Sequence, residues 1–318
     1  MMNEISVVIP NWNGERFLPL SLGSLKKSRF KDLETIVVNN GSTDKSVEYI
    51  RKNHPDVRLI NLDKNYGFAF ACNRGIEASK GKYVFLLNND MEVDKDCLDE
   101  LFKTMEEHPQ CSAAAVKMMF YDKRDKIYNT GDMLGITGTG GQRGFGEMDK
   151  GQYEEQEYVQ GVTAGAGFYR KSVFDEIGLL DEDYFIFSED VDWNFRAVLF
   201  GYKTIYVPTA LCYHIGTATV GVYSDRYVYL FMRNNLFNLF KNIPLVLIFK
   251  HLKSIMAYYF QYIRYFCLRG QGWAILKSRT SNLLHFPRTM AKRFKIQSQR
   301  KINVDEFEDI VVRRNLNG

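Results

Sequence analysis

A run of five apolar residues that stops at three polar ones is the feature that most constrains the fold. Tyr83–Leu87 is apolar throughout and is followed at once by Asn88, Asn89 and Asp90. Such a run is typical of a strand buried on both faces of a parallel sheet, and ligands bind such sheets beyond the carboxyl ends of the strands. We therefore expect Asp90 either to hold a divalent metal and, through it, a diphosphate, or to begin a turn before a helix over residues 95–108.

The first 111 residues alternate between short apolar runs and segments with helical patterns. This alternation predicts a doubly wound parallel sheet with right-handed crossovers. Pro10 closes the first strand, and Ser42 and Asp44 suit the start of the second helix. The expected strands cover residues 5–9, 33–38, 57–61 and 83–87; the expected helices cover 16–28, 42–53 and 95–108, and a loop at 65–75 leads into a further helix.

From residue 112 onward the pattern changes, and we expect an extension of the sheet. Strands are predicted over residues 112–121, 126–130, 162–169 and 203–207, the last ending at Pro208, and a helix over 171–177. Six glycines fall within residues 135–146. They predict a mobile loop, either a lid over the crevice or an ordinary surface excursion. Gly165 lies in a small-residue run that lets a ligand approach the backbone.

A second acidic cluster, Glu189, Asp190 and Asp192, opens a helix after the aromatic run at 184–187. One acid at a helix start is explained by the helix dipole, but three exceed what a cap requires. One carboxylate that holds a metal against phosphates, and a second that acts as a general base, would suit transfer of a group away from a diphosphate. Mg²⁺ or Mn²⁺ matches such oxygen ligands.

Charge is distributed unevenly along the chain. Residues 226–304 contain 15 of the 42 Lys and Arg residues and no Asp or Glu, so the other 27 accompany all 38 acids. This region predicts a phosphate-rich partner, and because the remainder is acidic we expect an anionic membrane surface rather than nucleic acid. Lys250, Lys253 and Arg264 interrupt the apolar stretch 244–268, which indicates an in-plane amphipathic helix rather than a span. The alternative is a helical hairpin packed on the sheet domain.

The five cysteines are widely spaced and include no CxxC pair, so neither a disulfide framework nor a zinc site is predicted. The N-terminus has no basic segment followed by an apolar one, so we expect no signal peptide. A reducing cytosol is the expected compartment.

The sequence resembles family-2 glycosyltransferases, and within them the rhamnosyltransferase-like branch, which builds bacterial cell-surface polysaccharides. The resemblance covers roughly residues 4–240 and implies a GT-A fold, which is a Rossmann-like, mostly parallel sheet with helices on both faces. It implies a catalytic domain over 1–217, with a nucleotide-binding part (1–111) and an acceptor part (112–217), before a basic, mainly helical region over 218–318. Five segments carry the resemblance in the family's order and spacing, at 10–14, 36–44, 65–75, 88–90 and 189–192.

The resemblance also implies roles for individual residues. Asp90 would ligate a Mg²⁺ or Mn²⁺ ion that bridges the donor diphosphate, and Asp190 would take the proton from the acceptor hydroxyl, which inverts the anomeric carbon. His214 matches a histidine that completes the metal or diphosphate site in some relatives, and a packed, hydrogen-bonded histidine is the alternative. The donor site is assigned to Pro10, Asn11, Asn39, Asn65, Asn73, Asn88, Asn89 and Asp90, and the acceptor side to Gly165, Glu189 and Asp192.

Two positions depart from the family pattern. Asn39 stands where an acid is common, and an amide oxygen can still accept a hydrogen bond from uracil or thymine, although without charge assistance. Asn88 replaces the first acid of the usual Asp-x-Asp, so we expect weaker metal binding that depends on the donor diphosphate.

The expected function is inverting transfer of a sugar from dTDP-rhamnose or a UDP-sugar to a lipid-linked or oligosaccharide acceptor. It would take place on the cytoplasmic face of the cell membrane, and the sequence leaves the oligomeric state open. The alternative is a non-catalytic protein that binds a nucleotide sugar or a polysaccharide.

Overall fold

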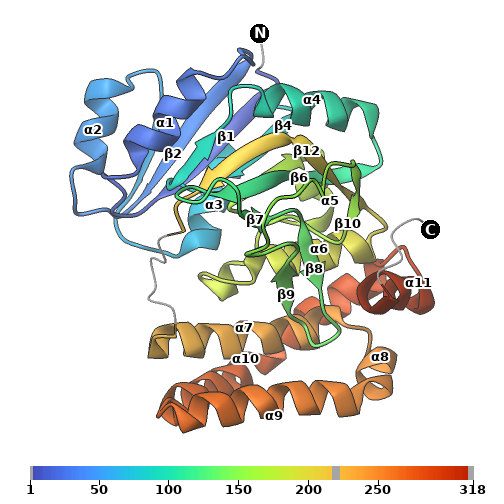
Figure 1. Cartoon of the computed structure of the whole chain (residues 1–318). Helices are drawn as coiled ribbons and strands as arrows, with labels where there is room; N and C mark the ends of the chain where they lie inside the picture. Colours follow the sequence, from blue (N-terminus) through green and yellow to red (C-terminus); the bar gives the residue numbers. More distant parts are fainter. Residues whose placement is uncertain (1–2, 217–222, 314–318) are drawn as a thin grey trace.

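The computed structural model describes residues 3–216 and 223–313, and its centre is a ten-stranded mixed sheet (Figure 1). The first four strands are parallel and lie in the order β3-β2-β1-β4. Their side chains alternate between two buried faces, so both faces require a cover of helices. This α/β architecture confirms the predicted fold class. The four strands are β1 (Ile5–Asn11), β2 (Leu33–Asn40), β3 (Arg58–Leu62) and β4 (Tyr83–Leu87).

Each face of the sheet is covered by its own set of helices. On β1, Val7 and Ile9 belong to the core with the helices of one face, whereas Val8 belongs to the core with those of the other. The first face carries α1 (Leu18–Lys26), α2 (Ser46–Asn53) and α4 (Cys97–Glu107); the second carries α3 (Phe68–Ala78), α5 (Lys171–Ile177) and α6 (Glu189–Leu199).

The chain that follows β4 extends the sheet beyond that strand. The strand β11 runs antiparallel between β4 and β6, and β12 lies parallel to β6. The prediction that the last strand ends at Pro208 is wrong, because β12 continues to His214 across a register shift between Val207 and Leu211. An irregularity of this kind tolerates a residue that has no N–H to donate. These strands are β5 (Met91–Val93), β6 (Cys111–Phe120), β7 (Ile127–Asn129), β10 (Glu157–Val159), β11 (Ala166–Arg170) and β12 (Lys203–His214).

The glycine-rich segment forms a small hairpin of β8 (Asp132–Leu134) and β9 (Gly140–Gln142), not an irregular loop. Its tip lies against two C-terminal helices. A Cβ on Gly138 would lie 2.5 Å from the backbone nitrogen of Leu239, and the Thr137 carbonyl accepts a hydrogen bond from the Tyr259 hydroxyl at 2.9 Å. Contacts with these helices therefore order a segment that could not order itself.

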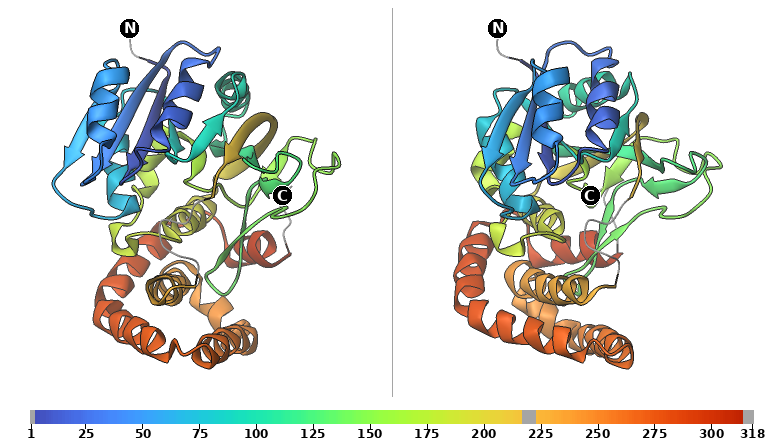
Figure 2. Two further views of the ribbon diagram at one scale, coloured as in Figure 1. Left: turned by 60° about the vertical axis from the view of Figure 1, so that its left-hand side comes forward. Right: turned by 90° about the vertical axis from the view of Figure 1, so that its left-hand side faces the viewer.

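The C-terminal region is helical and lies beneath the face of the sheet that carries α6 (Figures 1 and 2). Among the described residues, no helix is both long and apolar enough to cross a bilayer. The expected boundary between residues 217 and 218 lies outside the described residues. The elements are α7 (Asp225–Asn242), α8 (Leu245–Lys250), α9 (Leu252–Leu268), α10 (Gly272–Gln299), α11 (Val304–Glu308) and a π-helical turn, η2 (Asp309–Arg313).

Candidate functional site

A cavity of about 800 Å³ lies at the carboxyl ends of β1 and β4. Seven residues predicted from the sequence line it: Pro10, Asn11, Asn65, Asn88, Asn89, Asp90 and His214. The structure thus brings together residues from four separate segments of the chain. The other lining residues are Trp12, Asn13, Arg16, Phe17, Asn40, Gly67, Phe68, Phe120, Tyr128, Phe145, Phe185, Ile186, Phe187, Ile215, Gly216, Ser224 and Arg226.

Amide side chains connect the strand ends on the floor of this cavity. The Asn89 amide donates to Asn11 Oδ1 at 2.7 Å, and the Asn11 amide donates to Ser42 Oγ at 3.3 Å. Gly14 permits this arrangement, since a Cβ there would lie 2.1 Å from Asn89 Nδ2. The loop after β1 is therefore held against the end of β4 by a network of hydrogen bonds.

Asp90 and His214 lie side by side because β5 pairs with the end of β12, with Met91 opposite His214. The His214 Nε2 and Asp90 Oδ1 atoms are 3.2 Å apart. Cis ligands of an octahedral ion with metal–oxygen bonds of about 2.1 Å are themselves about 3 Å apart, so this pair fits a shared Mg²⁺ or Mn²⁺. No group of three or more acidic, histidine or cysteine ligands occurs among the described residues, so amide oxygens, water or an anionic ligand would supply the other ligands.

Two arginines that the sequence analysis missed also line the cavity. Arg16 follows the loop after β1, and Arg226, near the start of α7, lies with its guanidinium 5.2 Å from the centre of the Phe185 ring. Two arginines beside one carboxylate suit an anionic ligand better than a cationic one. Arg226 opens the basic segment at 226–304, but its sequence position did not indicate that it reaches the cavity.

Aromatic side chains form another part of the wall, next to His214. Phe145 packs against Phe120 and Tyr128, with ring centres 5.5 and 5.4 Å apart, and Tyr128 in turn packs on the His214 ring at 4.4 Å. Flat apolar surfaces beside polar groups are typical of sites for organic ligands. This part of the cavity suits a ligand with an apolar face.

Two predicted donor residues lie elsewhere. The Asn39 amide donates to Asn61 on β3 at 3.2 Å, and its oxygen accepts from the Ser42 backbone, whereas its neighbour Asn40 lines the cavity. Asn73 is buried and exchanges hydrogen bonds with the Leu180 backbone at 2.8 and 3.1 Å. In this structure both side chains hold backbone segments together.

Asp190 lies beside the cavity and is not among the residues that line it. Its carboxylate accepts hydrogen bonds from Thr163 Oγ1 at 3.2 Å and from the Ala164 backbone at 3.1 Å, and the next residue, Gly165, accepts one from the Asn88 backbone at 2.8 Å. Burial raises the pKa of Asp190 above its usual range, although these hydrogen bonds oppose the rise. Backbone contacts thus connect the two acidic clusters through residues 163–165.

Asp132 is a further acid near Asp190, and no sequence signal indicated it. It is 6 % exposed and accepts a hydrogen bond from the Asn129 amide at 2.7 Å. Burial, together with the negative charge of Asp190, raises the pKa of Asp132 to about 8. At neutral pH the folded protein therefore keeps a proton on Asp132.

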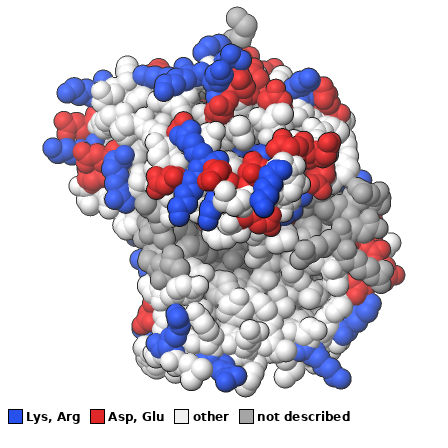
Figure 3. Space-filling model, in the orientation of Figure 1, with Lys and Arg blue, Asp and Glu red and all other residues white. Residues whose placement is uncertain are grey.

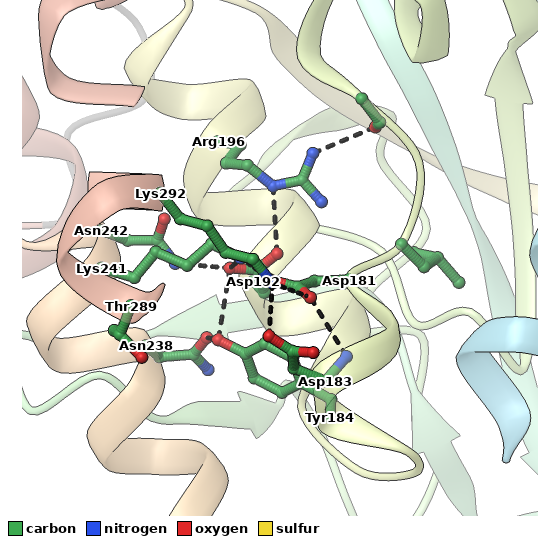
Figure 4. Close-up of polar contacts among 12 residues, drawn as sticks. Asp181, Asp183, Tyr184, Asp192, Arg196, Asn238, Lys241, Asn242, Thr289 and Lys292 are labelled. Carbon is green, nitrogen blue, oxygen red and sulfur yellow. Dashed lines mark hydrogen bonds and ion pairs between the residues drawn. The ribbon is translucent and has the colours of Figure 1, made fainter. Parts of the chain in front are cut away.

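The other two acids of the second cluster are buried. Burial raises the pKa of Glu189 well above its usual range. Asp192 is completely buried, yet Lys241 Nζ at 2.7 Å and Arg196 Nε at 3.0 Å outweigh this burial and lower its pKa. Figure 4 shows that Asp192 faces the side chains of α7 rather than an open site. The third acid of the cluster thus joins α6 to the C-terminal region.

Known proteins include several whose sequences are similar to this one. The family model described as glycosyl transferase family 2 matches residues 6–178. A poly-beta-1,6-N-acetyl-D-glucosamine synthase from Staphylococcus epidermidis is 26% identical over 220 residues, which are 68% of this chain and 51% of the relative. An uncharacterized glycosyltransferase, YibD, from Escherichia coli is 43% identical over 94 residues, which are 29% of this chain and 27% of that protein. The chain spans about half the length of the synthases it matches.

Solved structures resemble this one in fold. GalNAc-T7 with UDP, GalNAc and Mn²⁺ superimposes with a TM-score of 0.56 at 16% identity, covering 76% of this chain and 51% of that one. The mannosyltransferase PcManGT from Pyrobaculum calidifontis, in complex with GDP-Man and Mn²⁺, gives a TM-score of 0.52 at 13% identity, covering 99% of this chain and 88% of that one. At such identities the likeness concerns the fold alone, and it agrees with the predicted GT-A architecture.

Proposed function

Because this chain belongs to glycosyl transferase family 2, we propose that it transfers a sugar, with inversion, from a nucleoside diphosphate sugar to a saccharide or lipid-linked saccharide acceptor. The observation that carries the proposal is the Asp90–His214 pair, with 3.2 Å between its atoms, in a cavity that Arg16 and Arg226 also line. The arginines and the imidazole suit the diphosphate, and a carboxylate beside them suits a divalent ion.

In this proposal the donor nucleotide occupies the half of the cavity formed by Pro10, Asn11, Asn65, Asn88 and Asn89. Asp90 and His214 would hold the metal, which would supply positive charge to the diphosphate leaving group. Asn39 and Asn73 remain assigned to the donor side, where their hydrogen bonds support the Ser42 turn and the helix α3.

The acceptor would lie along the aromatic wall, with its hydroxyl directed toward Asp190. Asp190 removes the hydroxyl proton, the oxygen bonds to the anomeric carbon from the face opposite the nucleotide, and the bond to the diphosphate breaks. Glu189 and Asp192 flank this base in the first turn of α6, and Gly165 follows Ala164, whose backbone N–H donates to it; we assign these three residues to the acceptor side.

We place the product in bacterial cell-surface polysaccharide synthesis, with dTDP-rhamnose or a UDP-sugar as donor. The relative named as a poly-beta-1,6-N-acetyl-D-glucosamine synthase supports the polysaccharide, and the resemblance to rhamnosyltransferases supports the donor. We further propose that the protein lies on the inner face of the cell membrane, bound through the exposed apolar side chains and the basic residues of α8–α10.

A panel of nucleotide sugars, each with and without Mn²⁺, tests this proposal on the wild type and on Asp190→Asn. We expect one donor to raise the melting temperature more with Mn²⁺ than without it, in both proteins. Sugar transfer should fall at least about 100-fold in Asp190→Asn, because a general base contributes about 10²–10⁴-fold.

The control is Asp175→Asn, the same change at an exposed position on α5, which should transfer sugar normally. Wild-type transfer by Asp190→Asn would remove Asp190 as the base. Donor binding without turnover by the wild type would point to the non-catalytic alternative.

A further inference from the structure

The loop that joins η1 (Glu182–Tyr184) to α6 has an unfavourable backbone conformation. Phe185, Phe187 and Ser188 have φ angles of 65°, 71° and 66°, and none of them is a glycine. At Phe185 the ψ angle is −61°, and the Ile186 N–H donates to the Tyr184 carbonyl at 2.8 Å, which together form a γ-turn of the rare, strained type. Such a conformation persists only where its surroundings impose it.

This loop contributes to the site in two ways. Phe185, Ile186 and Phe187 line the cavity, and Ser188 is directly followed by Glu189 and Asp190 at the start of α6. The loop also contacts the donor half, because the Phe185 carbonyl accepts a hydrogen bond from the Phe68 backbone at 2.6 Å. A shift of the loop would therefore move the cavity wall and the proposed base together.

Two adjacent side chains of α7 donate to carbonyls of this loop and of the two residues before it, Asp183 and Tyr184, so that the segment they contact is 183–188. Asn234 Nδ2 lies 3.1, 3.0 and 2.7 Å from the carbonyl oxygens of Tyr184, Ile186 and Phe187, respectively. Arg233 Nη2 donates to the carbonyls of Asp183 at 2.9 Å and Tyr184 at 2.8 Å. Arg233 Nε also donates to Asn234 Oδ1 at 2.9 Å, which orients the amide so that its N–H groups face the loop.

Burial makes these hydrogen bonds strong constraints. Asn234 is 0 % exposed and Arg233 is 9 % exposed, so water cannot readily replace the donors if a side chain is removed. The carbonyls would then be left buried without partners, and the strained turn would lose what holds it.

We propose that Arg233 and Asn234 are positioning residues that hold the loop 183–188, and through it Asp190 and the aromatic wall, in the geometry needed for sugar transfer. The kinetic part of this inference rests on the proposed function, whereas the structural part does not. In this proposal α7 helps to set the geometry of the active site, in addition to packing on the sheet domain.

The test combines kinetics with hydrogen–deuterium exchange on the full chain. In Asn234→Ala we expect kcat to fall about 10- to 100-fold, in line with the cost of a small displacement at a reacting centre, while the donor KM changes less than threefold. Amide exchange should accelerate in residues 184–191 and stay unchanged in the strands β1–β4. Arg233→Lys, which keeps the charge but cannot reach two carbonyls in the same way, should give a smaller change of the same kind.

The matched control is Gln297→Ala. Gln297 on α10 also donates its amide to a backbone carbonyl of α7, that of Asn242 at 2.8 Å, but it does not contact the loop. It should leave both kcat and the exchange of residues 184–191 unchanged. If Asn234→Ala fails to fold, Arg233→Lys decides the question.

Unchanged exchange in residues 184–191 of Asn234→Ala would overturn the proposal, as would acceleration spread evenly over the whole chain. A wild-type protein that transfers no sugar would refute the proposed function only, and the exchange result would still decide whether Arg233 and Asn234 hold the loop.

Discussion

At the scale of single residues, similar carboxylates in this protein behave differently because their surroundings differ. Lys241 and Arg196 outweigh the burial of Asp192 and lower its pKa, whereas burial and the charge of Asp190 raise the pKa of Asp132 to about 8. The sequence shows only that these residues are acids. Their protonation states follow from burial and from the charge of the neighbours.

The raised pKa of Asp132 predicts a pH-dependent stability. The folded protein keeps this proton up to about pH 8, while the unfolded chain releases it near 3.8, so the stabilising contribution is complete below pH 3.8 and is lost as the pH rises toward 8. The loss is at most about 1.4 kcal/mol per pH unit. The variant Asp132→Asn has no carboxyl group to titrate at this position. The difference in unfolding free energy between the variant and the wild type should therefore shift in favour of the variant from pH 5 to pH 8.

Urea denaturation at pH 5, 6.5 and 8 measures this difference. The control is Asp122→Asn, at an exposed position close in the sequence, whose stability should follow that of the wild type at each pH. If the free energies of unfolding of Asp132→Asn and the wild type changed by the same amount between pH 5 and pH 8, Asp132 would not be buried in its neutral form.

At the scale of elements, buried ion pairs connect α6 to the C-terminal helices. Lys241 on α7 contacts both Asp181 and Asp192, at 2.5 and 2.7 Å, and Lys292 on α10 contacts Asp181 at 2.6 Å (Figure 4). A buried carboxylate requires a partner, so these lysines constrain where α7 and α10 can pack. The lack of acids in residues 226–304 is consistent with this, because some of the cations of this segment pair with acids near α6.

Lys241→Met tests the importance of this connection. The variant leaves Asp192, which is 0 % exposed, with Arg196 as its remaining cation, and we expect a loss of about 3–5 kcal/mol of unfolding free energy at pH 7. The loss should be smaller near pH 4, where protonation neutralises the unpaired carboxylates. Urea denaturation at both pH values measures it.

Lys301→Met provides the comparison, because the Lys301 side chain is 57% exposed and that of its partner, Glu176 on α5, is 36% exposed. This surface pair should contribute less than about 1 kcal/mol. Equal losses for the two variants would show that burial does not distinguish them.

At the scale of the whole molecule, the C-terminal region has an inner side and an outer side with different properties. The inner side supplies Arg233, Asn234 and Lys241 to the catalytic part, as described above. On the face drawn in Figure 3, the lower part of the molecule is largely uncharged, with Lys and Arg toward its edge. Apolar side chains exposed on α8–α10 include Leu245, Val246, Phe249, Leu252, Met256, Phe260, Leu268, Trp273, Leu276, Leu283 and Leu284.

Three exposed apolar side chains of α9 lie along one line of the helix. Leu252, Met256 and Phe260 are four residues apart, and on α8 the Phe249 side chain is 72 % exposed. Exposed apolar area of this kind, among basic residues, favours the interface of an anionic bilayer.

Flotation with vesicles tests this surface in the full chain. We expect the wild type to float with phosphatidylglycerol-containing vesicles more than with phosphatidylcholine alone, and a triple variant, Phe249→Ser, Phe260→Ser and Leu283→Ser, to float at least about tenfold less. Met148→Ser, which removes an exposed apolar side chain far along the chain from this surface, is the control. Equal flotation of the triple variant and the wild type would contradict the membrane proposal.

The alternating strands and helices, the place of the cavity at the end of Tyr83–Leu87, and the family could all be predicted from the amino-acid sequence. These depend on local hydrophobic periods and on motifs within short segments, which survive in any single sequence. It also identified seven of the lining residues, because strand ends in such a sheet meet at one edge.

The sequence could not predict which of two adjacent side chains enters the site, or which partner a charged side chain contacts. Asn39 and Asn40 are adjacent, and since successive side chains on a strand point in opposite directions, one lines the cavity and the other does not. Asp132, Arg226, Arg233 and Asn234 come from distant segments, and the sequence pattern around each does not specify its neighbours. Their roles depend on contacts between parts of the chain that only folding brings together.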